Sequence, residues 1–149
     1  MYCTEADIRQ ILKADLLAQL VSGEAVASPE EAQQLLSIII EQAISDAGAE
    51  IDGYLAARYP VPLSKPPTII SKYAKDLAVY NLVSRIGVGG GDDRENNYLK
   101  RYQYAIKFLE MVAKGTVDLG ISPPAKQAAT GFQMTGPQRV FSRDSLKGM

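Results

Sequence analysis

Residues 28–63 carry an apolar repeat that is typical of one long helix. Ser28 followed by Pro29 is a helix start, because the serine can cap the first turn and the proline is tolerated there. Pro60 and Pro62 end the pattern, because proline cannot continue a helix. About 30 helical residues at ~1.5 Å each would span roughly 45 Å, long for one domain. Between start and stop, apolar residues recur in steps of 4, 3, 4 and 3, the spacing of one helix face: Ile40, Ile44, Ala47, Ile51 and Tyr54.

The other helical patterns predict an all-α fold, a small helical bundle around this long central helix. Residues 68–85 are apolar on nearly all sides, which is typical of a helix at the centre of a core or of one covered by other chains. The glycines in 87–91 follow a helix and precede two aspartates, so they indicate an interhelical loop and not a phosphate-binding loop. The remaining helices are expected at 4–12, capped by Thr4, at 16–21, capped by Asp15, and at 94–114, capped by Asp92 or Asp93.

The pattern changes after Gly115, where scattered prolines and glycines leave no helical period. We therefore expect a helical domain over 1–115 and an extended C-terminal arm over 116–149, with a short strand near 138–141. Within the arm, apolar residues stand among charges, which favours docking onto a partner over folding alone. In an extended chain, alternate side chains point the same way. The predicted partner-binding residues are Arg139, Val140, Phe141, Arg143 and Leu146.

The net charge of −1 hides an uneven distribution along the chain. Residues 1–52 hold ten acidic and two basic side chains, a balance of −8, whereas residues 53–149 hold seven acidic and fourteen basic ones, a balance of +7. Two interpretations stay open: solvated helix faces that differ in sign without consequence, or head-to-tail contact between copies of the chain.

Several kinds of chemistry lack their usual residues. The chain has no histidine, which removes the commonest general base and the commonest metal ligand, and its single cysteine has no base beside it in sequence. We predict no catalytic residue, no metal site and no cofactor. Asp46, Glu50 and Asp52 are interpreted as a solvated or interface-facing acidic face.

Two further patterns have a structural and a functional interpretation. Tyr98 and Tyr102 lie beside basic residues, as in nucleic-acid-binding surfaces. Their spacing favours core packing, because they continue in steps of 4, 3, 4 and 3 along one helix face through Ala105, Leu109 and Val112. Gly48 and Gly53 sit among alanines in the long helix, which favours close helix packing inside the monomer over approach by a neighbouring subunit.

No run nears the ~18 apolar residues of a membrane span, and no signal pattern opens the chain, so no membrane association is expected.

The block AISDAGAEIDGYLAARYPVPL at 43–63 resembles the head–tail connector, or adaptor, proteins of Mu-like bacteriophages. The resemblance extends to YCTEADI at 2–8, KYAKDLA at 72–78 and RVFSRDSL at 139–146. It implies a structural protein without catalytic residues, made in the bacterial cytoplasm and placed in the virion neck. There it would form a ring of twelve copies beneath the portal protein and above a downstream neck or tail-terminator protein. Genomic DNA would pass through the ring without specific binding.

The alternative is a small helical nucleic-acid-binding regulator or a small enzyme. A size measurement separates the two, because an adaptor assembles with itself or a portal, whereas a regulator stays small and retards DNA.

Overall fold

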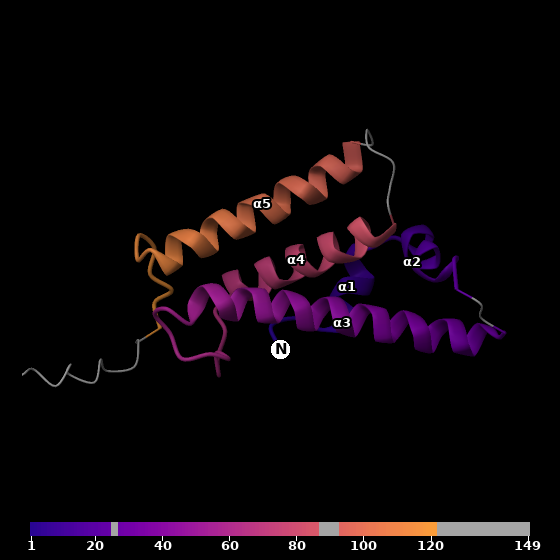
Figure 1. The fold of residues 1–149 in the computed structure, drawn as a ribbon, viewed down its shortest axis with the longest axis horizontal. Helices are drawn as coiled ribbons and strands as arrows, with labels where there is room; N and C mark the ends of the chain where they lie inside the picture. The colour runs from indigo at the N-terminus through magenta and orange to yellow at the C-terminus, as the bar shows by residue number, and fades with distance from the viewer. Residues whose placement is uncertain (25–26, 87–92, 122–149) are drawn as a thin grey trace, which may run out of the picture.

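The fold is organised by one helix, α3, against which the other elements pack (Figure 1). A computed structural model of the chain describes residues 1–24, 27–86 and 93–121. Within these residues the structure is all-helical and has no strand, so the predicted fold class is confirmed. The helices are α1 (Glu5–Ile11), α2 (Ala14–Val21), α3 (Pro29–Leu55), α4 (Thr68–Ile86) and α5 (Asp93–Ala113).

The long helix α3 begins where the sequence predicted and ends slightly earlier. The Ser28 hydroxyl accepts a hydrogen bond from the Glu31 amide at 3.2 Å, and Pro29 occupies the first turn. The helix ends at Leu55 after 27 residues, about 40 Å at ~1.5 Å per residue. Beyond it, the amides of Arg58 and Tyr59 both donate to the Leu55 carbonyl at 2.9 Å, closing a final turn. Pro60 stops the chain from continuing beyond this turn, because the helical region is disfavoured for the residue before a proline, here Tyr59.

The central position predicted for residues 68–85 is confirmed. Figure 1 shows α4 between α3 and α5, and α4 also packs against α1 and α2. Ile70, Leu77 and Leu82 are almost completely buried on this helix. On α5, Ala105, Leu109 and Val112 are fully buried, as their spacing predicted. One buried residue was not predicted: Asp76 lies on the buried side of α4, within the core of the protein.

The two short helices test the cap predictions. Thr4 caps α1 as expected: its hydroxyl accepts from the Asp7 amide at 3.3 Å, and Asp7 Oδ2 accepts from the Thr4 amide at 3.0 Å. For α2 the prediction was wrong. This helix begins at Ala14, its N-cap Lys13 makes no side-chain cap bond, and Asp15 lies inside the first turn, where its charge still favours the helix N-terminus.

The small residues of α3 separate into two groups. Ala43 and Ala47 are buried, and a Cβ on Gly48 would lie 3.9 Å from the Tyr2 ring, so packing inside the monomer explains these three. Gly53 is exposed and has no atom within 4 Å of such a Cβ. Ala49 is also exposed. Intramolecular packing therefore explains only part of this pattern.

Candidate interaction surfaces

The predicted partner-binding residues 139–146 lie outside the described residues, as do the glycine cluster at 87–91 and the expected strand at 138–141. Most of the expected arm, 122–149, is also outside. The first part of the arm, 116–121, is described. Val117, Leu119 and Ile121 pack against the core as partly buried side chains. The chain therefore stays on the helical body as far as Ile121.

Arg58 holds this segment in place at the end of α3. Its Nη1 donates to the carbonyl oxygens of Val112 and Val117, both at 3.3 Å, and its Nη2 lies 3.7 Å from a carboxylate oxygen of Asp118. The two carbonyl bonds fix the chain just before and just after the end of α5. Because α5 ends there, the Val112 carbonyl accepts a turn bond from the Gly115 amide, at 3.0 Å, and the guanidinium adds a second bond. Arg58 is therefore a positioning residue for the start of the arm.

Gly115 allows the chain to turn against Arg58. Its φ is +81°, a conformation that favours glycine, and a Cβ there would lie 3.5 Å from the Arg58 guanidinium. Beyond the turn, the Tyr59 hydroxyl accepts a hydrogen bond from the Leu119 amide at 3.2 Å. A pocket of about 390 Å³ lies next to this segment, lined by Tyr59, Pro60, Pro62, Leu63, Lys65 and Ile121. It is a mostly apolar hollow at the point where the described chain ends.

The three carboxylates at 46, 50 and 52 do not converge on one site. Asp52 accepts a short hydrogen bond from the Tyr2 hydroxyl, which itself accepts from the Leu63 amide at 2.9 Å. Burial, followed by the bond to Asp52, raises the pKa of Tyr2 to about 12. Asp52 therefore ties the N-terminus to the loop after α3. It contributes to the fold and is not a free acidic group.

Glu50 has a similar role toward α5. The Tyr102 hydroxyl donates to Glu50 at 3.1 Å, and the Tyr102 ring stacks on Tyr80 with 4.5 Å between ring centroids. Burial, then the bond to Glu50, raises the pKa of Tyr102 to about 12. Core packing of Tyr102 is thus confirmed. Of the three predicted acidic residues, only Asp46 is exposed, and it accepts a bond from Gln42 within α3 at 2.7 Å.

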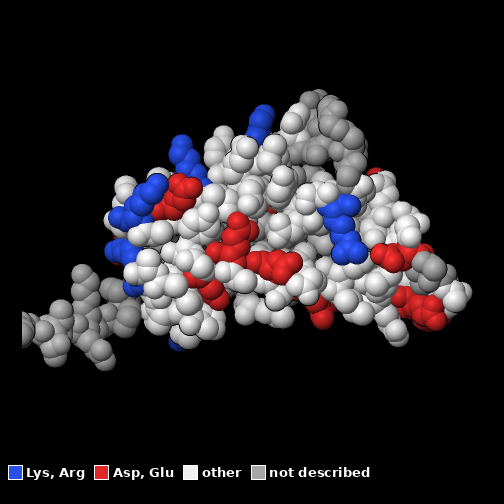
Figure 2. All heavy atoms as spheres, viewed as in Figure 1, with Lys and Arg blue, Asp and Glu red and all other residues white. Residues whose placement is uncertain are grey.

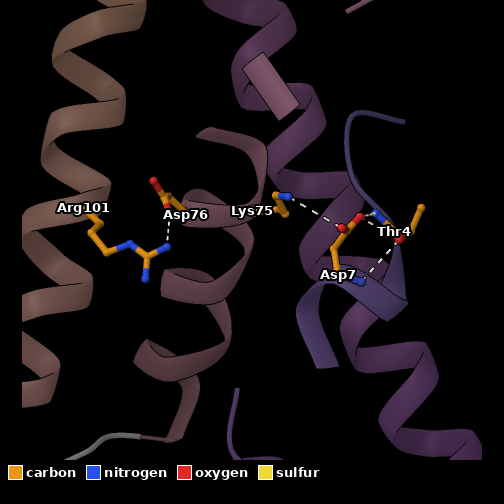
Figure 3. Close-up of polar contacts among 5 residues, drawn as sticks. All are labelled: Thr4, Asp7, Lys75, Asp76 and Arg101. Carbon is orange, nitrogen blue, oxygen red and sulfur yellow. Dashed lines mark hydrogen bonds and ion pairs between the residues drawn. The ribbon is translucent and has the colours of Figure 1, made fainter. Parts of the chain in front are cut away.

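Asp76 is a buried charged residue that the sequence did not lead us to predict (Figure 3). Its side chain is 1% exposed, yet it accepts from Lys72 Nζ at 2.8 Å and makes a short bond with Arg101 of α5. The neighbouring Lys75 points the other way, toward Asp7 of α1, at 3.6 Å. The signal available in sequence was an aspartate within an apolar helix, four residues after a lysine.

Reactive groups are scarce in the part of the chain that the structure describes. Among the described side chains of 1–24, 27–86 and 96–121, no three Asp, Glu or Cys residues gather as metal ligands would. Cys3 is buried, and burial raises the pKa of its thiol to about 11, which disfavours the reactive thiolate. A 390 Å³ hollow beside it is lined by Tyr2, Cys3, Glu5, Asp7, Glu41 and Lys75. None of the described helices has the length and apolarity to cross a membrane.

Charge divides between helices on the face shown in Figure 2. Acidic side chains gather over α3 and the end where it begins, and basic ones lie mainly along α5 and the end where it finishes. On this face, acidic and basic side chains are therefore separated between the helices.

The described residues form a small all-α protein with ion pairs between its helices and opposite charge on two of its helices. A family model described as Bacteriophage Mu, Gp36 matches residues 2–135, so the chain belongs to this family of bacteriophage proteins. The Mu-like prophage FluMu protein gp36 of Haemophilus influenzae is 30% identical over 128 residues, covering 84% of this chain and 85% of that relative. Gene product J of Escherichia phage Mu is 30% identical over 108 residues, covering 70% and 72%.

Proposed function

We propose that the protein is a structural component of the virion, a head–tail connector that forms a ring of twelve copies beneath the portal in the neck of a tailed phage. Membership in a bacteriophage Gp36 family supports a role in the particle or its assembly. The resemblance of residues 43–63 to connector proteins supplies the narrower role. The ring would bind the portal on one side and a downstream neck or tail-terminator protein on the other, and DNA would cross it without specific binding.

The observation that carries this proposal is the anchoring of the arm. Arg58 and Tyr59 bind residues 112–119 at the end of α3, so the chain reaches Ile121 as an ordered part of the body. The 28 residues beyond Ile121 then start from a fixed point at one end of the molecule. Fully extended, a chain of this length spans up to roughly 90 Å, at ~3.3 Å per residue. That reach suffices to contact a neighbouring copy or the portal.

This geometry gives no support to the enzyme alternative. Asp52 and Glu50 accept hydrogen bonds that hold distant parts of the chain together. Burial raises the pKa of the Cys3 thiol to about 11, so the thiol is protonated at neutral pH. We propose that the protein does no catalysis.

A phage carrying a stop codon early in this gene tests the proposal. We expect filled or fillable heads and complete tails that do not join, and joining restored when the wild-type protein is supplied from a plasmid. Electron microscopy of the lysate shows heads and tails separately. Defective DNA replication or gene expression with normal joining would support the regulator alternative instead.

A further inference from the structure

Two described helices each present a large exposed side chain on a face that also carries exposed charges of one sign. On α3, Ile38 is 62% exposed, and on α5, Tyr104 is 67% exposed. Both lie in the interior of long helices, where an exposed large side chain is not explained by fraying. Within the described residues, no side chain covers Ile38 or Tyr104 to any large extent.

The α5 face is a basic line. Lys100, Tyr104 and Lys107 are exposed and follow one another in steps of 4 and 3, so they lie on one side of the helix. Lys114 continues the same line. Lys100 and Lys107 form no ion pair with the described side chains of 1–24, 27–86 and 96–121. Two lysines thus flank an exposed tyrosine, and the described structure does not neutralise them.

The α3 face is its acidic counterpart. Ile38, Ser45 and Ala49 are exposed in steps of 7 and 4 and form a line of modest bulk. Because successive helical residues are rotated by about 100°, the exposed Glu41 lies on one side of this line and the exposed Asp46 on the other. Neither carboxylate forms an ion pair with another described residue.

We infer that the α5 face of one protomer (Lys100, Tyr104, Lys107) docks on the α3 face of the next (Ile38, Glu41, Asp46), forming the repeating contact between copies of this chain. A symmetric pairing of either face with itself would place like charges together, which is unfavourable. Opposite faces on different helices instead give a head-to-tail contact, which closes into a ring when the rotation per subunit allows it. This inference rests on the proposed function and names the surfaces that would build the ring.

The exposed positions fit such a contact. Tyrosine supplies a large apolar area with a polar end, which suits a surface that is buried only on assembly. Ser45, Ala49 and Gly53 leave little bulk along α3, so a partner helix can approach closely. This explains the exposed small residues that packing inside the protomer does not explain.

Charge reversal tests the inference in the full-length protein. One variant carries Lys100→Glu with Lys107→Glu, and a second carries Glu41→Lys with Asp46→Lys. Each should stay folded by circular dichroism, because all four residues are exposed, and each should weaken self-association at least tenfold in sedimentation velocity. A matched control for the first variant, Lys13→Glu with Lys65→Glu, makes the same change in net charge at exposed positions away from both faces and should assemble like the wild type.

Mixing the two variants gives the decisive result. The first variant offers two acidic faces and the second two basic faces, so neither pairs with itself, but they should pair alternately and assemble when mixed in equal amounts. In infected cells, a phage lacking the gene should be complemented by the two variants together and by neither alone. Raising the salt concentration should weaken both the wild-type and the mixed assemblies.

Three results would overturn the inference. If both variants assemble like the wild type, the contact lies elsewhere, while the connector role still stands. If each variant fails and mixing does not restore assembly, the two faces do not meet. If Lys100→Glu with Lys107→Glu abolishes retardation of DNA but leaves assembly intact, the basic face binds nucleic acid. If the wild-type protein neither self-associates nor enters particles, the proposed connector function itself is wrong.

Discussion

Asp76 of α4 and Arg101 of α5 form an ion pair in which the carboxylate is 1% exposed and the guanidinium side chain is 37% exposed. The pair therefore lies at the edge of the core, with its negative partner inside. Lys72 reaches the other oxygen of Asp76 from the same helix at 2.8 Å. Figure 3 shows that the next residue, Lys75, turns toward Asp7 of α1. Two consecutive residues of α4 thus connect it to the helices on either side.

Replacing Arg101 by Met should destabilise the protein. The methionine keeps much of the apolar stem, but Asp76 loses one of its two partners while staying buried. Leaving a buried polar group incompletely bonded costs about 1–3 kcal/mol, and the remaining bond to Lys72 favours the lower end. Urea unfolding measures the loss. Lys100→Met on the same helix is the control and should change stability by less than about 0.5 kcal/mol, because Lys100 is exposed and unpaired within the described residues. If Arg101→Met and Lys100→Met have equal free energies of unfolding, the Asp76–Arg101 ion pair contributes nothing to stability.

Glycine substitutions should distinguish an open helical position in α3 from the tight turn that follows α5. Gly53→Ala should stabilise the monomer by roughly 0.5–1 kcal/mol, because Gly53 is helical and its Cβ position is open. Gly115→Ala should destabilise it by about 1 kcal/mol or more, because the φ of +81° disfavours alanine and the new Cβ meets Arg58. Thermal unfolding of the two variants measures both effects. A stabilising Gly115→Ala would mean that the turn is not held as described.

The N-terminal carboxylates should make stability depend on pH. Hydrogen bonds from Thr4 hold the pKa of Asp7 below its usual 3.8, and bonds from Arg9 and Ser37 hold the pKa of Glu5 below its usual 4.5. A group with a lowered pKa in the folded state stabilises the fold fully above its ordinary pKa, and this contribution is lost as the pH falls through the folded value. Unfolding free energies measured from pH 6 to pH 3 should therefore fall more steeply for the wild type than for Glu5→Gln with Asp7→Asn. Gln10→Ala, an exposed change on the same helix, controls for helix propensity. Parallel pH curves for wild type and double variant would contradict this account.

Much of the fold followed from local patterns in the sequence. The 4, 3, 4, 3 spacing located the buried sides of α3 and α5, and Ser28 and Thr4 located two helix starts, because caps and periodicity depend only on near neighbours. Asp76 was missed for the opposite reason. Its partner Arg101 is 25 residues away, and only the packing of α4 on α5 brings the two together.

The candidate surfaces were predicted only in part. Asp46, Glu50 and Asp52 were grouped as one acidic face, but two of them bind tyrosines from distant parts of the chain, 50 and 52 residues away. Tyr102 was placed correctly, whereas the exposed Tyr104 was not singled out, because its neighbours in sequence resemble those of the buried tyrosines. The role of Arg58 depends on the turn at Gly115, 57 residues later, which no local pattern encodes.

The arm beyond Gly131 should act between chains. Its apolar residues, which include Phe132, Val140 and Phe141, are too few to make a core, so removing them should cost the helical body nothing. All the fully buried side chains of the described structure lie before residue 115. A chain ending at Gly131 should therefore keep the wild-type circular dichroism spectrum and melting temperature.

The same truncation should prevent stable incorporation into particles. Docked on a neighbour or on the portal, Phe141 alone would bury apolar surface worth roughly 2 kcal/mol before the ordering cost, and Arg139 and Arg143 would add charge contacts on an acidic surface. Complementation of a phage lacking the gene measures the effect as a loss of infectious particles. Arg139→Glu with Arg143→Glu in the full-length chain should reproduce the loss, whereas Lys126→Glu with Lys147→Glu, an equal change in net charge outside this segment, should not. Infectious particles built with the truncated chain would show that the arm is dispensable, and a truncated chain that no longer folds would show that it belongs to the body.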